Sequence, residues 1–551
     1  MTRDDIRVAL EAAKQDWSEI NPSIMGTLFE RGLDPGKRSQ LGAHYTDAEK
    51  IMLIVRPVII EPLLREWDAA RAEIDGLLVK SRAAKSAGTK TKVYKEAEAR
   101  KNQFIERLRN FRVLDPACGS GNFLYLALKA LKDIEFRVNF EAEGFGLPAA
   151  FPSVGPECVK GIEINPFAAE LARVSVWIGE IQWMREKNLG VSKNPILKPL
   201  ETIECRDALL NPDGTEAEWP EADVIIGNPP FLGAKRMRSG GPEQVGSLGD
   251  IYVSKLRKTF DGKLADFSDF VCYWFEKARA AMVAQDASRV GLVATNSISG
   301  GTNRAVLDKI CSECKIFEAW SDEPWVVDGA DVRVAIICFA PRAINELLRL
   351  DGIPVATINP DLSASNINLA LSKKLDTSLE RAFIGVQPSG PFQVEAEIAR
   401  QWLELPVNPN GKRNSQVLRP YMNGLDIVRR STDTWIVDFG DSLGESEASL
   451  FEMPFKHVLE GVKPFRFASR TEDGRKNWWI AWRARSEMRN ALAPLSRFML
   501  TPRVAKHRVF VWVYSPVLPD SAVVAIARDD DTAFGILHSK FHELWSLRMY
   551  T

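Results

Sequence analysis

Long apolar runs are missing from this chain of 551 residues. No stretch approaches the ~20 apolar residues that a membrane-spanning helix needs. The first ten residues, MTRDDIRVAL, carry acidic side chains where a secretory signal has a positive region followed by an apolar stretch. We therefore expect a cytoplasmic protein with no membrane partner.

Cysteine is scarce as well. Seven cysteines are spread over the whole chain, which argues against a disulfide framework and for reduced thiols. Only Cys311 and Cys314 form a Cys-x-x-Cys pair, and no second pair follows at the spacing of a zinc site. No metal is therefore expected. Internal repeats and long low-complexity tracts are also missing, which excludes a repeat protein.

A large excess of either charge is missing too, since 72 Lys and Arg stand against 73 Asp and Glu. The chain as a whole is not a basic nucleic-acid binder, so the distribution of charge matters more. Cations gather at 80–101, 235–263 and 456–508. The last region mixes cations with tryptophans, which suits phosphate contact and base stacking, although a charged surface over a tryptophan-rich core fits equally. Its residues are Arg475, Lys476, Arg483, Arg485, Arg489, Trp478, Trp479 and Trp482.

The composition that is present is that of a globular protein, with 45% hydrophobic and 26% charged residues. The length predicts roughly two to four domains. Between 111 and 345, short apolar runs alternate with helical patterns, which predicts an α/β domain with a doubly wound, mainly parallel sheet. The predicted strands are FRVLD, VKGIEI, TIECRDA, ADVIIGN, RVGLVAT, KIFEAW and VRVAIICFA.

The flanking segments have other patterns. Residues 1–65 predict a helical region, with a loop before a helix that begins near Asp47. Residues 66–110 are rich in Ala, Lys, Glu and Arg and predict a charged helical hairpin, inserted before the α/β domain. Residues 346–384 predict a linker. Aromatic residues and strand-like runs are frequent in 385–551, which predicts a second domain of mixed α+β type.

The first chemical motif is DPACGSGNF, directly after an apolar strand. The strand ends at Asp115, and the chain turns through Gly119 and Gly121 into a helix. Glycines here let the backbone approach a ligand that a β-carbon would repel, and the helix N-terminus offers free amides to a carboxylate. Nicotinamide-binding enzymes use a similar turn, so the glycines alone leave an oxidoreductase open. The complete string is much more specific.

Two acidic residues follow at strand ends. Glu163 ends the second predicted strand, where a carboxylate can accept hydrogen bonds from both ribose hydroxyls. Asp207 ends the third, where it can accept a hydrogen bond from an adenine amine. Ligands of open α/β sheets lie outside the carboxyl ends of the strands. We therefore expect Asp115, Glu163 and Asp207 to converge on one crevice.

The second motif is NPPF, at the end of the fourth predicted strand. An aryl amine is a poor nucleophile because its lone pair is delocalised into the ring. If the Asn228 side-chain oxygen and the Pro229 carbonyl accept hydrogen bonds from the amine, its nitrogen moves toward tetrahedral geometry and the lone pair is freed. Pro230 helps to fix the backbone, and Phe231 can stack on the base. A base inside a duplex must first be flipped out.

In this order the motifs resemble those of amino-methylating DNA methyltransferases, which are Rossmann-like enzymes. LGAHYT, which ends at Thr46, looks like the segment that precedes their cofactor motif. This order resembles the gamma arrangement, in which the target-recognition domain follows the catalytic domain. GIEINPFAAELARVSVWIGEIQWM and VLRPYMNGLDIV are similar to the type IIL single-chain restriction-modification enzymes and their phage-defence relatives.

The resemblance implies a site-specific enzyme that moves a methyl group from S-adenosyl-L-methionine to the exocyclic amine of adenine in duplex DNA. A loop must also close over a flipped base, and the basic, glycine-containing segment 233–250 after NPPF is the predicted lid, although a surface loop without this role fits nearly as well. The resemblance assigns catalysis to Asn228, Pro229, Pro230 and Phe231. It assigns cofactor contacts to Thr46, Asp115, Ala117, Gly119, Gly121, Asn122, Glu163, Ile164, Asp207 and Ala208.

The sequence departs from these relatives at both ends. The first 110 residues lack a Pro-Asp followed by Glu-x-Lys, so cleavage is not predicted, and a separate nuclease or defence-system partner proteins are expected instead. The chain stops at FGILHSKFHELWSLRMYT, a segment that lies inside the recognition domain of the relatives. A truncated target-recognition domain is therefore one interpretation of 385–551.

Several alternatives stay open. N4-cytosine methylation uses the same chemistry, although that class usually has Ser at the position of Asn228. Protein and RNA methyltransferases also use related motifs, but they are smaller. Carbon-5 cytosine methylation needs a Pro-Cys nucleophile after a strand, and this dipeptide is missing. A catalytically idle DNA-binding subunit is the alternative outside enzymology, and the intact Asn228 and Phe231 argue against it.

Overall fold

The structure is a computed structural model that describes residues 7, 11, 47–190, 199–238, 248–327, 330–364, 375–468, 475–505 and 507–549. The chain divides into two compact units, Met1–Ala370 (unit 1) and Leu371–Thr551 (unit 2). The division falls inside the segment 346–384. Within the described ranges, no helix is both long and apolar enough to cross a membrane.

One large sheet organises unit 1. Its strands are β1 (Val113–Asp115), β2 (Val159–Glu163), β3 (Ile203–Cys205), β4 (Val224–Gly227), β5 (Arg289–Thr295), β6 (Cys314–Val327), β7 (Ala330–Pro341), β8 (Leu348–Leu350) and β9 (Ile353–Val355). They lie in the order β3-β2-β1-β4-β5-β7-β6-β8-β9. The first five are mutually parallel, and β7 is antiparallel to both β5 and β6. All seven predicted strands lie in this sheet, which confirms the α/β fold class.

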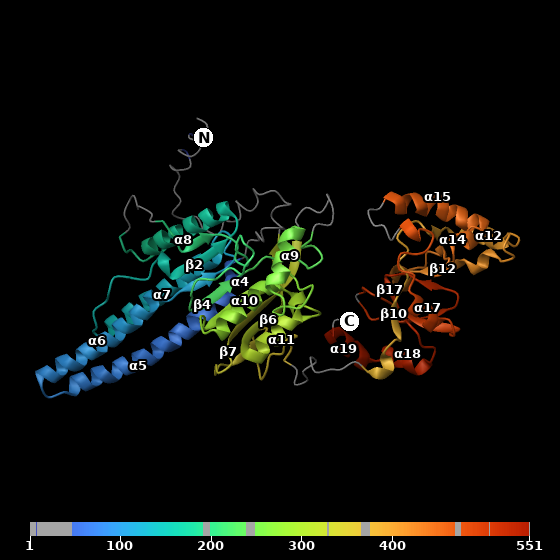
Figure 1. Cartoon of the computed structure of the whole chain (residues 1–551). Helices are drawn as coiled ribbons and strands as arrows, with labels where there is room; N and C mark the ends of the chain where they lie inside the picture. Colours follow the sequence, from blue (N-terminus) through green and yellow to red (C-terminus); the bar gives the residue numbers. More distant parts are fainter. Residues whose placement is uncertain are drawn as a thin grey trace. The chain divides into compact units, whose positions relative to one another are not determined.

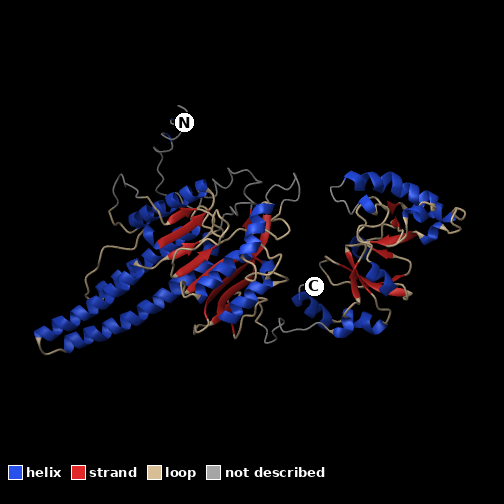
Figure 2. Cartoon of the chain, in the orientation of Figure 1, coloured by secondary structure: helices blue, strands red, loops and turns tan. Residues whose placement is uncertain are grey.

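Helices cover both faces of the sheet. They are α4 (Ala48–Val55), the π-helix η1 (Arg56–Ile60), α7 (Asn122–Gly144), α8 (Pro166–Glu186), α9 (Asp250–Thr259), α10 (Val271–Val283) and α11 (Arg304–Glu313). α7 packs against α4 and α8, whereas α10 packs against α11 and β5. The strand order reverses between β1 and β4. Right-handed crossovers therefore place α7 and α8 on one face of the sheet, and α10 and α11 on the other. Figure 2 shows the strands between these helices.

A helical hairpin projects from unit 1 (Figure 1). It consists of α5 (Glu61–Ala83) and α6 (Ala87–Arg109), joined by a short turn that Ser86 caps by accepting a hydrogen bond from the Thr89 amide at 3.1 Å. Buried residues recur every three or four positions along α5, which is the spacing of one helix face. They are Leu63, Trp67, Ala70, Ile74, Leu78 and Ser81.

Unit 2 has the predicted mixed α+β character. Its strands form two sheets of four, in the orders β10-β17-β14-β15 and β11-β13-β12-β16. The strands are β10 (Ala382–Ile384), β11 (Gln393–Val394), β12 (Leu418–Met422), β13 (Trp435–Val437), β14 (Arg497–Pro502), β15 (Val511–Tyr514), β16 (Leu518–Pro519) and β17 (Val523–Ile526). The helices are α12 (Ala396–Glu404), α13 (Gly424–Val428), α14 (Glu445–Ala448), α15 (Glu452–Ala468), α17 (Ser486–Leu492), α18 (Asp531–Leu537) and α19 (Lys540–Met549).

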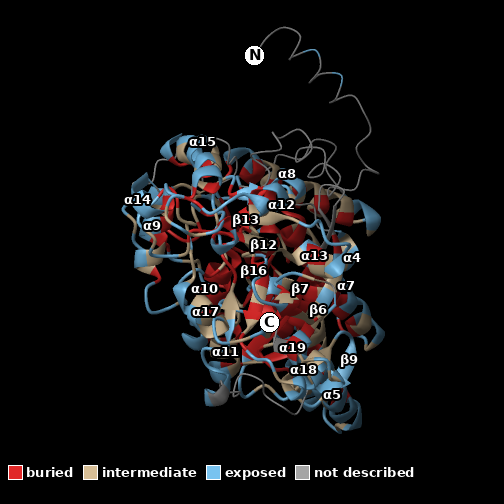
Figure 3. Ribbon diagram, turned by 90° about the vertical axis from the view of Figure 1, so that its right-hand side faces the viewer, coloured by how far each residue is buried: buried red, intermediate tan, exposed pale blue. Residues whose placement is uncertain are grey.

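Each unit has its own hydrophobic core. In unit 1, all four residues of β4 are buried, as expected for a parallel strand that is covered on both faces. Figure 3 shows buried residues along the strands and exposed residues on the outer sides of the helices. The core of unit 2 contains Phe392, Tyr421, Trp478 and Trp479. The two units are therefore packed independently.

Candidate active site

The candidate residues gather at one edge of the large sheet. β3, β2, β1 and β4 are parallel neighbours, so their carboxyl ends lie side by side; we call this the carboxyl edge. Asp115 and Glu163 are the last residues of β1 and β2. Asp207 follows β3 by two residues, and Asn228 directly follows β4. The strand order thus places Asp115, Glu163 and Asp207, which were expected to converge on one crevice, at the same edge as Asn228.

Asp115 is buried at the start of the glycine turn. Only 1% of it is exposed, and its Oδ1 accepts a hydrogen bond from the Ala117 amide at 3.0 Å. Burial, together with the charge of Glu163, raises the pKa of Asp115 to about 8. The carboxyl group has no basic partner among the described residues that would offset this burial. A cation bound beside it would favour its ionised form.

Gly119 and Gly121 occupy their positions in the turn for different structural reasons. Both have positive φ, +53° at Gly119 and +86° at Gly121, a conformation that other residues rarely adopt. A β-carbon at Gly121 would lie 2.9 Å from the Cα of Ala172 on α8, so this glycine is required for helix packing. A β-carbon at Gly119 would meet no atom within 4 Å, so the space beside it is open. The open side of the turn is thus at Gly119.

Asn122 begins α7 directly after this turn. Its side chain is 7% exposed, and its Oδ1 is buried with no hydrogen-bond partner in the described part of the chain. A buried acceptor without a donor is costly, which makes this oxygen a candidate ligand contact. Asn122 also lines a cavity of about 460 Å³ between α4 and α7, together with Ala48, Met52 and Tyr125.

Glu163 links the glycine turn to the end of β2 through a hydrogen bond. Its Oε2 accepts a hydrogen bond from the Gly119 amide at 3.0 Å, and its Oε1 accepts one from the Asn165 amide at 2.8 Å. Burial raises the pKa of Glu163, although these amides favour the charged form. Each carboxylate oxygen can accept a second hydrogen bond, so Glu163 can still bind hydroxyl groups. The next residue, Ile164, is 55% exposed and offers an apolar surface beside it.

Asp207 has a partner that the sequence did not reveal. Its Oδ1 accepts hydrogen bonds from the amides of Leu209 and Leu210, at 2.7 and 3.3 Å. Its Oδ2 accepts one from the hydroxyl of Tyr252 on α9, at 2.8 Å. Tyr252 follows 45 residues later in the sequence, and no local pattern links the two. The hydrogen bond joins α9 to the carboxyl edge and orients the carboxylate.

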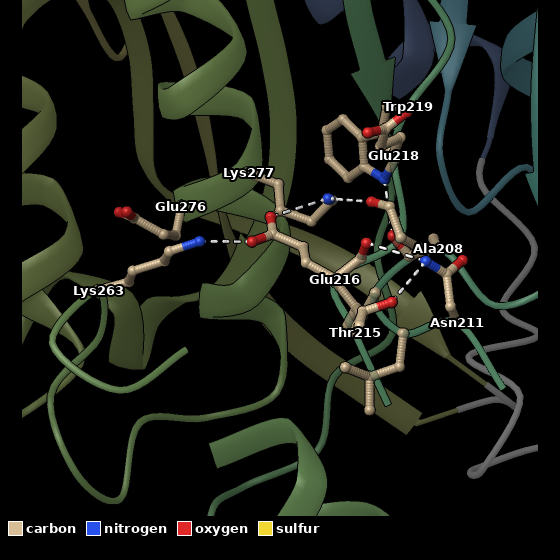
Figure 4. Close-up of polar contacts among 12 residues, drawn as sticks. Ala208, Asn211, Thr215, Glu216, Glu218, Trp219, Lys263, Glu276 and Lys277 are labelled. Atoms are coloured by element: carbon tan, nitrogen blue, oxygen red, sulfur yellow. Dashed lines mark hydrogen bonds and ion pairs between the residues drawn. The ribbon is translucent and has the colours of Figure 1, made fainter. Parts of the chain in front are cut away.

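A polar network holds the segment after Asp207 in place (Figure 4). The carbonyl of Ala208 accepts a hydrogen bond from the Trp219 indole at 2.8 Å. Lys277 of α10 donates to Glu216 at 3.0 Å and to the carbonyl of Ala217, and its ammonium group lies 5.0 Å from the Trp219 ring centroid. These contacts fix the loop from several sides. Ala208 is buried, so it can contribute to a site mainly through its backbone.

The NPPF turn lies in direct contact with the glycine motif. A β-carbon at Gly227, the last residue of β4, would lie 2.5 Å from Oδ1 of Asp115. Only glycine therefore allows β4 to pass this close to Asp115. Asn228 is the next residue, Pro229 is buried, and Phe231 packs against the core of unit 1. The two motifs, more than a hundred residues apart in sequence, thus share one place in the fold.

Asp269 organises the chain that follows the NPPF turn, and no sequence motif indicated it. Its Oδ1 accepts a hydrogen bond from the Ala234 amide at 2.9 Å. Its Oδ2 accepts hydrogen bonds from Asn303 at 2.6 Å and from the Ser297 hydroxyl at 3.0 Å. The Phe270 amide donates to the Leu232 carbonyl at 2.9 Å. The segment before α10 therefore ties the NPPF loop to the turn after β5.

Two expected features lie partly or wholly outside the described residues. Thr46, predicted to contact the cofactor, is outside them. The basic segment 233–250, predicted to act as a lid, is described at 233–238 and 248–250 only. In the ranges that are described, no group of three or more His, Cys, Asp or Glu side chains could hold a metal ion.

The basic and aromatic residues of unit 2 separate into two groups. Trp478 and Trp479 are buried in the core of unit 2, which is the tryptophan-rich core that the sequence left open. Arg489 is bound to Asp438 through two hydrogen bonds, at 2.7 and 2.8 Å. Lys476, Trp482, Arg483 and Arg485 instead line a groove of about 870 Å³.

Comparison with known proteins agrees with the resemblance drawn from the motifs. Residues 91–349 match the family described as MmeI, DNA-methyltransferase domain. DNA methyltransferase A of Bacillus subtilis (strain 168) is 28% identical over 393 residues, which are 68% of this chain. The match spans 40% of the length of that protein.

The solved structure of the type IIL restriction-modification enzyme MmeI in complex with DNA has the same fold. The two chains superpose with a TM-score of 0.71 at 23% sequence identity. The superposition covers 97% of this chain and 69% of the other. The similarity in fold therefore extends through both units.

Proposed function

We propose, from the MmeI-type DNA-methyltransferase domain that residues 91–349 match, that this protein methylates DNA. The methyl donor is S-adenosyl-L-methionine, and the acceptor is the exocyclic amine of adenine in duplex DNA. One observation carries the proposal: the contact of Gly227 with Asp115 sets the NPPF turn against the glycine motif. A donor and an acceptor held by these two motifs would be neighbours, as group transfer requires.

The residues at the carboxyl edge fit this cofactor. Asp115 is a buried carboxyl without a basic partner in the described chain, and a cationic ligand would complement it. The partnerless Oδ1 of Asn122 can accept a hydrogen bond from a ligand amine, and Glu163 can accept them from ribose hydroxyls. Ile164 offers an exposed apolar surface on which a purine ring can lie. When bound, the cofactor supplies a methyl group that its sulfonium has already activated.

The NPPF turn would activate the acceptor. The Asn228 side-chain oxygen and the Pro229 carbonyl accept hydrogen bonds from the amine, and the consecutive prolines keep this geometry fixed. Phe231 is partly buried, so its ring is held firmly enough to support a flipped base. Asp269 and Asn303 are positioning residues, because they fix the loop that follows the turn.

Unit 2 would recognise the target sequence. Its groove presents cations and Trp482 on a rigid α+β domain, a combination that suits contact with phosphates and bases. The protein would act in the cytoplasm as the modification component of a restriction or antiviral system, and a separate nuclease or other defence proteins would be its partners.

Transfer of a tritiated methyl group from the cofactor to unmethylated plasmid DNA tests this function. We expect incorporation by the protein and a loss of about 100-fold or more in Asn228→Ala, because the amine loses a pre-oriented acceptor. Calorimetry should show that this variant binds S-adenosylhomocysteine normally. Digestion of the product to nucleosides should give N6-methyladenine, whereas N4-methylcytosine would identify the alternative acceptor. If no DNA is labelled although the cofactor binds, the protein is an idle subunit.

A further inference from the structure

The hairpin of α5 and α6 is braced to unit 1 only over part of its length. The indole of Trp67 donates to Glu141 of α7 at 2.7 Å, and Lys101 donates to the Pro148 carbonyl at 2.5 Å. The contact that lies farthest out joins the Tyr94 hydroxyl to the Gly146 carbonyl at 2.8 Å. The part beyond it projects away from the sheet (Figure 1). We call residues 76–95 the tip.

Charge is segregated along this hairpin. Between Gly76 and Lys95 the sequence has six cations and no Asp or Glu. All six are exposed, and none forms an ion pair with any residue that the structure describes. They are Lys80, Arg82, Lys85, Lys90, Lys92 and Lys95.

The cations nearer the base are arranged differently. Arg71 pairs with Glu141 of α7 at 3.1 Å, and Arg100 pairs with Glu73 across the hairpin at 2.6 Å. Arg107 pairs with Asp223 at 2.7 Å. Acids therefore accompany these cations near the base of the hairpin. In the tip the contacts are those of uncharged side chains, such as Tyr94 with Gly146 and Ser81 with the Lys90 carbonyl, and the cations have no acidic partner among the described residues.

Folding alone does not account for six unpaired cations at the tip. Like charges three or four residues apart on a helix repel, as Lys92 and Lys95 do on α6. Uncharged polar residues would keep the tip hydrated without this repulsion. A patch of one sign that is exposed and held on a stiff support is suited to a partner of the opposite sign.

We infer that the tip binds the phosphate backbone of duplex DNA, away from the base that enters the carboxyl edge. The inference rests on the proposed function, which makes a long polyanion the substrate. α6 ends at Arg109, shortly before β1 begins at Val113, so the base of the hairpin lies at the edge of the sheet opposite the carboxyl edge. The tip is therefore well separated from the carboxyl edge. Contacts of Lys and Arg with phosphates are independent of sequence and add to affinity by releasing counterions.

The test compares two triple variants. In the tip variant, Lys85, Lys90 and Lys92 are changed to Gln. In the control variant, the same change is made at Arg65, Arg109 and Arg333. These three are exposed cations of unit 1 that are already paired with Glu346, Glu106 and Asp322.

Fluorescence anisotropy would measure the affinity of each protein for a random-sequence duplex of ~40 base pairs, from about 50 to 200 mM KCl. We expect the slope of log K against log salt to fall in magnitude by about 2 to 3 in the tip variant, because each lost phosphate contact contributes about 0.9. The control variant should change it by less than about 1. Binding of S-adenosylhomocysteine should be equal in all three proteins.

Equal salt slopes in the tip variant and the wild type would overturn the inference. So would a tip variant that loses affinity for anionic vesicles but not for the duplex, since the partner would then be a membrane surface. Both results leave the proposed function intact if the wild type labels plasmid DNA. A wild type that binds the duplex and the cofactor but transfers no methyl group would contradict the proposed function and not the role of the tip.

Discussion

At the scale of single residues, the ionisation of Asp115 should couple stability to pH. Its pKa is about 8 in the folded protein and ~3.9 in an unfolded chain, so the folded state binds the proton more tightly. The resulting stability is complete below about pH 4 and is lost as pH rises through 8. Asp115→Asn keeps the acceptor for Ala117 but cannot ionise. We expect it to raise Tm by several degrees at about pH 9 and to change it little at about pH 4.

The same residue should make cofactor binding depend on pH. Between about pH 6 and 7.5, the wild type should bind S-adenosylmethionine up to ~10-fold more tightly per pH unit, because a cationic ligand favours the ionised carboxylate. Calorimetry without DNA measures this dependence. In Asp115→Asn the affinity should be weaker and nearly constant over this range. A wild type with constant affinity would show that Asp115 does not face the positive part of the ligand.

At the scale of elements, Asp269 should control the rate more than binding. Asp269→Asn weakens the link between the NPPF loop, the turn after β5 and the start of α11, because an amide offers only one acceptor where the carboxylate offers two. We expect kcat for methyl transfer to fall roughly 10-fold or more, whereas KM for the cofactor changes less than about 3-fold. Asp213→Asn is the matched control, since Asp213 is exposed and bonds only within its own loop. A lower kcat together with a higher KM and a lower Tm would indicate a purely structural role.

The large sheet was predictable because its strands are short apolar runs, and burial on both faces leaves that pattern in the sequence. β8 and β9 were not predicted, since each has three residues, and the sequence of β9 is largely exposed. The motif residues were predictable because each ends a strand. Tyr252 and Asp269 were not, because their partners lie on other elements and a contact between distant residues has no local pattern.

At the scale of the whole molecule, composition could not show which residues of the basic and aromatic segment of unit 2 belong to the core and which line the groove. Trp478 and Trp479 stabilise the core, whereas Arg483 and Lys476 lie on the surface of a groove. Arginine-tryptophan sequences are compatible with either role, since burial depends on the register of the surrounding strands. Gly121 illustrates the same limit, because the sequence indicates an approach to a ligand and the structure shows close packing against Ala172.

Because each unit has its own core, we expect that cofactor binding by unit 1 can be separated from DNA recognition by unit 2. All described residues of the carboxyl edge belong to unit 1, and unit 2 contributes none of them. A fragment that ends at Ala370 should bind S-adenosylhomocysteine within about 3-fold of the full chain, because no core contact is lost. Its affinity for duplex DNA should fall roughly 10-fold or more, since the groove of unit 2 is gone. Calorimetry and anisotropy measure the two affinities. A fragment that methylates plasmid DNA at the rate and with the site selectivity of the full chain would show that unit 2 does not recognise the target.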